Sequence, residues 1–409
     1  MSRFRKAIRR PSGAARGTAL AGRRNRLFGM AIGIAWLSSL LVPLAAAPAA
    51  FAQSPIKVGA IFPLSGGAGT QGQHIQQSLE TMSALINEAG GVLGRRIELV
   101  VRDDESTPAV GVSRASELVS AGVAVIIEGW NSPVTLAMQP VIARAGVLDL
   151  TAISKADPIL SGEGNPLAVR FNSSNAQDGA VIARYLANVV KAGKLAFLTQ
   201  NDAYGTGAQA TIEAELAKLG HTYRKVAEER FPFSQADFRV PLTNVRSAAP
   251  DATVAINASE GLGMPAIMRQ ARQMRLPGKL VTAVGTVSPS VIQVSGAAAA
   301  EGVIGADIYF PDVEPFASNP VNQRFVAKMQ AMHKQPPDKY MALAATALQV
   351  WAMAANELET LEREPIAKRI RGGSFKGTVM GDVTFEPNGQ LGSRHYLFTV
   401  KDGKIVVQP

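Results

Sequence analysis

Two polar segments that follow apolar runs are the parts of the sequence best suited to chemistry. The first is Gly129-Trp130-Asn131-Ser132-Pro133, between the β-branched run 123–127 and a helical pattern over 134–142. Serine followed by proline is typical of a helix start, with Ser132 as the N-cap and free backbone N–H groups beyond it. Such an end can bind a carboxylate or another anion without any catalytic residue. The pattern therefore predicts an anion-binding loop.

A second segment, rich in hydroxyl groups and basic, follows the next apolar run. It is Thr151-Ala152-Ile153-Ser154-Lys155, directly after residues 147–150. In open parallel sheets, ligands bind outside the carboxyl ends of the strands, so both loops would face one crevice. Ordinary capping would explain either loop alone. Two such loops in one exported chain favour a binding site.

One glycine motif suggests a nucleotide but does not fit one. Gly67-Ala68-Gly69-Thr70-Gln71-Gly72 matches G-x-G-x-x-G, which in dinucleotide folds brings the backbone to a pyrophosphate. Here residues 63–66 separate the motif from the preceding strand. The first acid at the end of a second strand is Asp103, thirty-one residues beyond Gly72, where the fingerprint wants an acid about 20 residues on. We expect a glycine-rich loop and no cofactor.

Other enzyme chemistries lack their residues. The chain has four histidines (His74, His221, His333 and His395), none at metal-ligand spacing and none beside a candidate nucleophile. There is no G-x-S-x-G elbow and no phosphate-binding lysine loop. We therefore expect neither a catalytic centre nor a metal site, and the chain is predicted not to be an enzyme.

The elements that must position these loops alternate regularly. Short apolar runs, predicted to be strands, separate helical patterns of ten or more residues along most of the chain. This alternation predicts doubly wound, largely parallel sheets with helices on both faces, in two lobes. The predicted strands are 56–62, 97–102, 123–127, 147–150, 195–199, 253–256, 280–283 and 302–306; the predicted helices include 73–89, 110–121, 178–192, 208–219, 264–274 and 322–333. After residue 380, the pattern predicts antiparallel hairpins around the turn 387–389 and around Asp402-Gly403.

The first 52 residues read as an export signal. Met1 to Arg26 holds nine Lys or Arg residues and no acid, residues 27–42 are apolar, and Ala50-Phe51-Ala52 offers a signal-peptidase site before Gln53. The apolar run is short for a membrane span, which favours a cleaved leader over an anchor. The pairs Arg9-Arg10 and Arg23-Arg24 leave Sec and twin-arginine export both open. We predict a periplasmic protein.

Removing the leader changes the charge of the chain. The whole sequence carries 42 Lys and Arg against 32 Asp and Glu, and 33 against 32 remain after the nine leader charges are removed. A nearly neutral mature chain gives no electrostatic case for nucleic acid or an anionic membrane. Cysteine is absent, which excludes disulfides and thiolate metal sites.

From Ile56 to Val400 the chain resembles exported substrate-binding proteins of ABC transporters, of the leucine/isoleucine/valine-binding type. The resemblance rests on the segments "IKVGAIFPLSGGAGTQG", "INEAGGVLGRRIELVVRDDES", "NDAYGTG", "QADFRVPLTNVRSAAPD", "IMRQARQMRLPG" and "MGDVTFEPNGQLG". The resemblance implies the type I periplasmic-binding fold, with two α/β lobes joined by three crossings and a ligand between them. It implies an N-terminal lobe of 53–172 plus 307–379 and a C-terminal lobe of 173–306 plus 380–409.

The resemblance also implies the ligand site. Ser132 and the Ile153, Ser154 and Lys155 loop would hold the ligand's carboxylate from the first lobe, and Tyr204 would approach from the second. Gln71 lies where family members often have a ligand contact, and Trp130 is a candidate wall for the apolar part of the ligand. The implied partners are a small-molecule ligand and an inner-membrane ABC permease, with the protein a monomer.

Two departures leave the ligand open. The family usually places an acid, for the ligand's ammonium group, after the strand ending near Ala283, and this sequence has Val284 there. Glu260, at a position where relatives often have tyrosine, would then be the replacement. Lys155 stands where Thr or Ser is common. Either Glu260 reads the amino group of an amino-acid-like ligand, or the ligand has no amino group and Lys155 pairs with a second polar group.

Two other functions fit parts of the sequence. A sensory subunit that presents an amide or aromatic acid to a regulator would have the same binding fold. An exported nucleotide-dependent enzyme would require the Gly67–Gly72 loop to hold a cofactor, which would absorb light in the purified protein.

Overall fold

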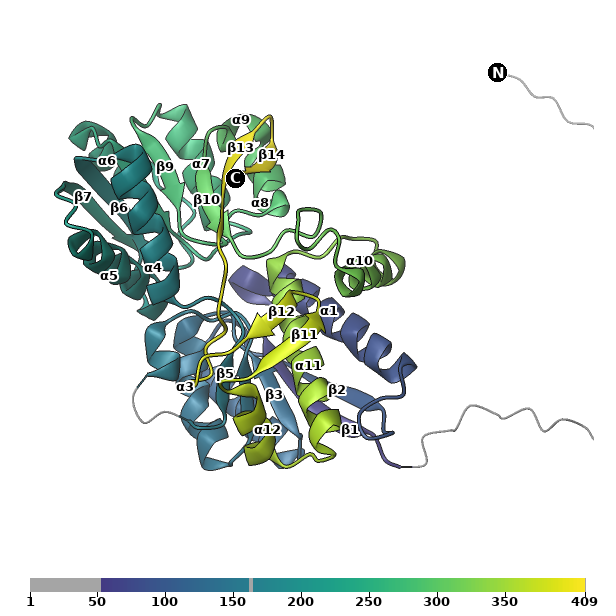
Figure 1. Ribbon diagram of the computed structural model, residues 1–409. Helices are drawn as coiled ribbons and strands as arrows, with labels where there is room; N and C mark the ends of the chain where they lie inside the picture. The colour runs from purple at the N-terminus through teal and green to yellow at the C-terminus, as the bar shows by residue number, and fades with distance from the viewer. Residues whose placement is uncertain (1–52, 162–164, 409) are drawn as a thin grey trace, which may run out of the picture. The chain divides into compact units, whose positions relative to one another are not determined.

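The computed structural model describes residues 53–161 and 165–408 (Figure 1). The predicted leader, residues 1–52, lies outside the described residues. Within the described ranges, no helix combines the length and the apolar character needed to cross a membrane.

The first sheet contains five strands, all parallel, in the order β2-β1-β3-β4-β5. It is built from the N-terminal part of the chain, as the alternation of apolar runs predicts. The strands are β1 (Ile56–Phe62), β2 (Ile97–Asp103), β3 (Val125–Glu128), β4 (Leu148–Thr151) and β5 (Ala168–Arg170). The helices that pack with it are α1 (Gly69–Glu88), α2 (Pro108–Ser120), α3 (Ser132–Arg144), α10 (Pro320–His333), α11 (Lys339–Leu358) and α12 (Arg363–Ile370).

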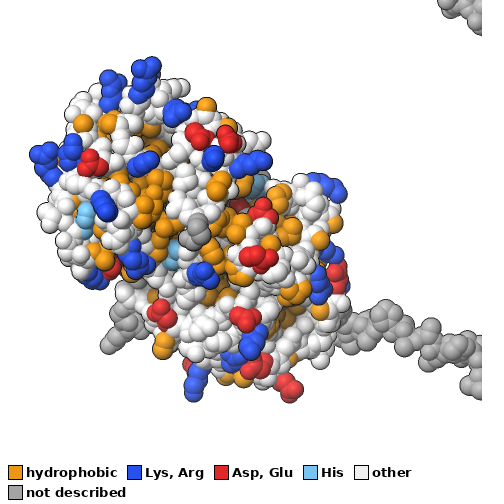
Figure 2. Space-filling model, turned by 45° about the horizontal axis from the view of Figure 1, so that its top comes forward, with side chains coloured by type: hydrophobic (Ala, Val, Ile, Leu, Met, Phe, Trp, Pro, Cys, Tyr) orange, Lys and Arg blue, Asp and Glu red, His pale blue; other side chains and the backbone are white. Residues whose placement is uncertain are grey.

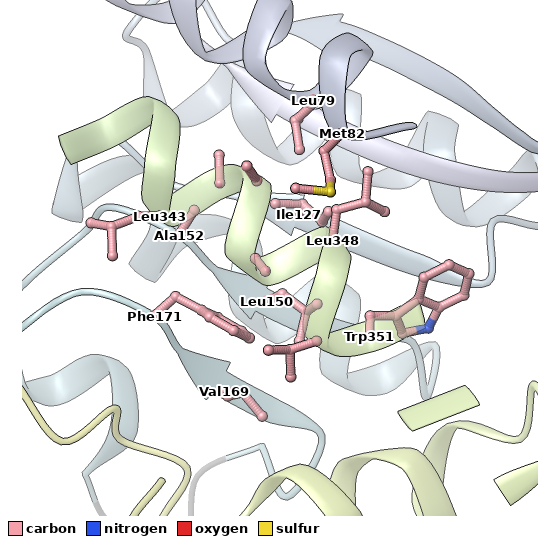
Figure 3. Close-up of a cluster of buried hydrophobic side chains, with 14 of the residues drawn as sticks. Leu79, Met82, Ile127, Leu150, Ala152, Val169, Phe171, Leu343, Leu348 and Trp351 are labelled. Atoms are coloured by element: carbon pink, nitrogen blue, oxygen red, sulfur yellow. The ribbon is translucent and has the colours of Figure 1, made fainter. Parts of the chain in front are cut away.

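Both faces of the first sheet are covered, which explains its continuous apolar runs. Along β3, Val125 and Ile127 join the core formed with α1 and α11, while Ile126 joins the core formed with α2 and α3. Figure 3 shows the first of these cores, to which α11 contributes Leu343 and Leu348 and β4 contributes Leu150. The period-2 alternation of a strand sends successive side chains to opposite faces. Packing on both faces therefore fixes the register of the strands and the positions of the loops at their carboxyl ends.

The second sheet contains seven strands in the order β14-β13-β10-β9-β8-β6-β7. The five strands from β10 to β7 pair in parallel, and the chain's last two strands add antiparallel pairs at the other edge. The strands are β6 (Lys194–Gln200), β7 (Arg224–Phe231), β8 (Ala252–Ile256), β9 (Lys279–Thr282), β10 (Ile304–Asp307), β13 (Tyr396–Lys401) and β14 (Lys404–Val407). The helices are α4 (Asn175–Arg184), α5 (Ala203–Lys218), α6 (Arg239–Ala248), α7 (Gly263–Gln273), α8 (Pro289–Ser295) and α9 (Ala297–Ala300).

The hairpins of the C-terminal region differ in part from the prediction. β13 and β14 form the predicted hairpin around Asp402-Gly403. β12 (Gly381–Thr384), however, pairs with β11 (Ser374–Thr378), which precedes it, and not across the turn 387–389. That turn supports only one bridge, between Phe385 and Leu391. Phe375 and Val383 of the actual hairpin pack in the core of the first sheet, and this packing decides the pairing.

Candidate ligand-binding site

A cavity lies at the carboxyl ends of strands from both sheets. From the first sheet it is lined by Trp130, Asn131 and Ser132 after β3, by Ile153 and Lys155 after β4, and by Asn172 after β5. From the second sheet it is lined by Gln200, Tyr204, Ala258, Val284 and Thr286, and Tyr340 at the start of α11 completes it. Its volume is about 30 Å³, room for roughly two water molecules. The walls must therefore separate for an amino acid or a similar acid to enter.

The loop after β3 is shaped by Gly129 and held by Ser132. Gly129 has φ +104°, and a Cβ there would lie 3.1 Å from the Ser154 hydroxyl, so the turn requires glycine. The N-cap of α3 is Asn131, not Ser132, and its side chain makes no capping hydrogen bond. The Ser132 hydroxyl instead accepts hydrogen bonds from the backbone N–H groups of Lys155 and Ala156, both at 3.2 Å. The capping prediction for Ser132 was wrong, and the hydroxyl ties the two predicted loops together.

Trp130 forms one wall of the cavity. Its ring contacts that of Tyr340, with centroids 4.7 Å apart and planes tilted by 56°. The side chain is 6% exposed, and its indole Nε1 has no hydrogen-bond partner among the described residues. Buried indole N–H groups usually find an acceptor. This group is therefore a buried donor without a partner in the described part of the chain, on a residue that lines the cavity.

Lys155 is buried in a network that connects the two sheets. Its ammonium lies 2.5 Å from Asp178 Oδ2 and donates to the backbone oxygen of Val284 at 3.0 Å. The other oxygen of Asp178 is 2.8 Å from His395 Nε2. Burial lowers the pKa of Lys155 to about 8, although the negative charge of Asp178 acts in the other direction and raises this pKa. Burial alone would raise the pKa of Asp178, but Lys155 and His395 outweigh it and lower that pKa to about 2.

Glu260, the proposed partner of a ligand ammonium, does not line the cavity. It is 2% exposed, and Oε2 accepts a hydrogen bond from the Ser288 hydroxyl at 3.0 Å. Its Oε1 has no hydrogen-bond partner within the described ranges. Burial, followed by the charge of Asp338, raises the pKa of Glu260 to about 7. At neutral pH this carboxyl is therefore only partly ionised.

Two other predicted residues, Ser154 and Gln71, are not among those that line the cavity. Ser154 is buried below the loop, with its hydroxyl 2.8 Å from that of Thr135. Gln71 belongs to α1, and its amide lies near Gly261, where a Cβ would be 3.8 Å from Nε2. Of the eight predicted residues, the cavity wall brings together Trp130, Ser132, Ile153, Lys155 and Tyr204. Ser154 supports the loop through Thr135, which donates to the buried Glu128 at 2.7 Å.

Several lining residues were not predicted from the sequence. Asn172 and Gln200 stand directly after or at the end of strands, so the same carboxyl-end argument that selected Ser132 would have found them. Tyr340 opens α11, whose N-cap Asp338 accepts from the backbone N–H of Met341. An aspartate before a long apolar run signals this helix start. No comparable sequence signal points to Ala258 or Thr286.

A larger hollow of about 540 Å³ lies elsewhere on the second sheet. It is bordered by Arg272 in the last turn of α7 and Arg275 after it, by Lys279, and by Gly302 and Val303 before β10. Lys279 begins β9, and Gly302 and Val303 precede β10, so the hollow lies at the amino ends of these strands. Ligands of open parallel sheets bind at the carboxyl ends, so the smaller cavity is the candidate site.

Comparison with known proteins agrees with this arrangement. A model of the periplasmic binding protein family matches residues 55–404. The Leu/Ile/Val-binding protein homolog 1 of Brucella suis is 27% identical over 341 residues, which is 83% of this chain and 88% of the relative. The chain belongs to the periplasmic binding protein family.

Two solved structures show the same fold with different ligands. The branched-chain amino acid transporter substrate binding protein of Streptococcus pneumoniae, in complex with isoleucine, is 23% identical with a TM-score of 0.77, over 87% of this chain and 100% of that one. An ABC transporter solute binding protein of R. palustris, in complex with benzoate, is 22% identical with a TM-score of 0.77, over 87% and 95% of the two chains. The fold is thus that of the type I periplasmic binding proteins, as predicted. The family and these neighbours are binding proteins, not enzymes.

Proposed function

We propose that this protein is the exported solute-binding component of an ABC importer. It binds an amino acid or a related small carboxylate in the cavity and delivers it to an inner-membrane permease. The observation that carries the proposal is the cavity at the carboxyl ends of both sheets, with Ser132 and Lys155 in its wall. The names of the relative and of the two neighbours, which bind isoleucine and benzoate, support a small carboxylate.

The proposal includes two lobes that separate to admit the ligand. Each lobe would be one sheet with its helices, acting in a monomer. The predicted third crossing lies near residue 380, but Phe385 and Leu391 pack in the core of the first sheet. We therefore place that crossing between Leu391 and Tyr396, where β13 begins. Opening would lengthen the Lys155–Val284 hydrogen bond and the 2.5 Å bond from the Tyr340 hydroxyl to the backbone oxygen of Gly285.

The surface charge agrees with a small solute rather than a polyanion. On the face that Figure 2 shows, basic and acidic side chains are interspersed. Binding to nucleic acid would need a basic patch or stripe. This observation and the nearly neutral mature chain favour a cleft ligand as the partner.

A ligand screen followed by one substitution tests the binding function. Thermal shift should first identify a stabilising solute among amino acids, aromatic acids, dicarboxylates and amides. Ser132→Ala should then weaken binding by roughly 1.5–3 kcal/mol, because a hydrogen bond to a charged group is lost. Calorimetry measures this loss. Ser295→Ala, which removes a buried hydroxyl of α8 away from the cavity, is the matched control. Equal affinities of the two variants would remove Ser132 from the site.

Uptake distinguishes transport from sensing. Cells that lack the protein should fail to accumulate the labelled solute, and the gene on a plasmid should restore accumulation. Normal accumulation together with a lost transcriptional response to the solute would identify a sensory subunit instead.

A further inference from the structure

The charged groups at the cavity are of one sign. Among the residues that line it, Lys155 alone carries a charge. The carboxylate that contacts Lys155, that of Asp178, uses one oxygen for Lys155 and the other for His395. Glu260 contacts Tyr340 and Ser288 and is not one of the residues that line the cavity. No acid in the described wall is free to receive a cation.

Three polar side chains of the wall have a hydrogen-bond donor without a partner in the described structure. Trp130 Nε1 has no partner among the described residues. The Ser132 oxygen already accepts two backbone N–H groups, so its hydrogen remains to be donated. Of the three hydrogens of the Lys155 ammonium, one goes to Asp178 and one to Val284. Three different side chains therefore offer a donor.

Two of the amide oxygens at the wall already accept hydrogen bonds from the protein. The amide oxygen of Asn172 accepts from the backbone N–H of Ser173 at 2.9 Å. The amide oxygen of Gln200 accepts from the backbone N–H of Ala258 at 3.0 Å. A ligand ammonium, which has only donors and carries a positive charge, would find no carboxylate among the described lining residues, and the charged group that it would meet is the ammonium of Lys155. Burying an unpaired ammonium costs several kcal/mol.

The rest of the wall is apolar. Ile153, Val284 and Ala258 contribute aliphatic surface, and the rings of Trp130, Tyr204 and Tyr340 contribute flat faces. Such a wall suits a hydrocarbon body attached to the anion.

We propose that the ligand is a monocarboxylate with an apolar body and no amino group. Its carboxylate takes the free donors of Trp130, Ser132 and Lys155, and its body packs against the aromatic and aliphatic wall. The inference rests on the proposed binding function and narrows the ligand class. Of the two alternatives that the sequence leaves open at Val284, it selects the ligand without an ammonium.

Matched pairs of ligands test this inference, using protein purified from cells that express the full chain. Leucine is compared with 4-methylpentanoate, and phenylalanine with 3-phenylpropanoate, so that each pair differs in one amino group. Calorimetry at pH 7 should show the amine-free member binding at least about tenfold more tightly in at least one pair, with the amino acid tighter in neither. Benzoate, added as a third acid, tests whether a ring placed directly on the carboxylate is preferred.

Two variants separate the contacts. Trp130→Phe keeps a ring but removes the indole N–H, and should weaken the amine-free acid at least about threefold. The matched control is Trp351→Phe, in the core formed by α11, which should leave affinity unchanged. Glu260→Gln should also leave the acid's affinity unchanged.

The outcomes distinguish the two proposals. Tighter binding of leucine or phenylalanine, especially if Glu260→Gln abolishes it, would overturn the inference and leave the binding function standing. Equal effects of Trp130→Phe and Trp351→Phe would overturn the assigned contact. If no solute of the screen binds, the proposed function fails with the inference.

Discussion

At the scale of single residues, Lys155 has the most consequence. It is a buried cation whose pKa burial lowers to about 8, and it connects the first sheet to Asp178 and to the backbone at Val284. A buried lysine stays protonated only if an opposite charge compensates for its burial, and here Asp178 provides that charge. The same ammonium is the charged donor proposed for the ligand.

Ligand affinity should therefore depend on pH. Below about pH 8, Lys155 is protonated and attracts a carboxylate; as the pH rises from 8 to 10 it loses its proton, and affinity should fall. Stability should respond in the opposite sense. The folded pKa lies below the unfolded value of 10.5, so the contribution of Lys155 to the unfolding free energy rises as the pH increases through this range. Calorimetry of the identified acid between pH 7 and 10 tests the first effect. A flat affinity would exclude Lys155 as a ligand contact.

At the scale of elements, the neighbouring strands β3 and β4 contain a buried acid each. Glu128 ends β3 and accepts hydrogen bonds from the hydroxyls of Thr135 and Thr151, both at 2.7 Å. Asp149 in β4 is fully buried, and neither of its oxygens has a hydrogen-bond partner among the described residues. Burial raises the pKa of both carboxyls, and Asp149 raises that of Glu128 further. The acids lie below the loops of the cavity.

Asp149→Asn should remove part of the pH dependence of stability. Because the folded pKa of Asp149 is raised above its unfolded value, the carboxyl's stabilising contribution is fully present below pH 4 and is lost as the pH rises towards neutrality. Relative to the variant, the native chain should lose on the order of 2–4 kcal/mol of unfolding free energy between pH 4 and pH 8. Chemical denaturation of both proteins at the two pH values gives the difference. Parallel pH profiles would show that Asp149 does not titrate in this range.

The elements also show what the sequence can predict. β1 has the predicted bounds, and the bounds of the other predicted strands differ from the prediction by a few residues at most. These strands could be predicted because a strand buried on both faces is a continuous apolar run in the sequence. β7 was missed since Arg224–Phe231 is an edge strand with mostly charged, partly exposed side chains. β5 was also missed, because a strand of only three residues is too short to form a recognisable pattern. Side-chain partners such as Asp178 for Lys155, 23 positions apart, depend on tertiary packing and leave no local pattern.

At the scale of the whole molecule, the basic N-terminal segment should be absent from the working protein. The sequence pattern ending at Ala50-Phe51-Ala52 predicts cleavage before Gln53. N-terminal sequencing of protein released by osmotic shock should read from Gln53 or close to it. Recovery of a membrane-bound chain that begins at Met1 would contradict export by a cleaved signal.

The second sheet meets Lys155 and Tyr340 through main-chain oxygens, those of Val284 and Gly285, and this has an evolutionary consequence. Position 285 is constrained, since it has φ +74° and a Cβ there would lie 1.6 Å from Lys339 Nζ. Position 284 carries a cavity-lining side chain whose replacement would leave its carbonyl in place. Natural selection can therefore change the solute preference at 284, within the volume available, while both hydrogen bonds across the cavity are inherited unchanged.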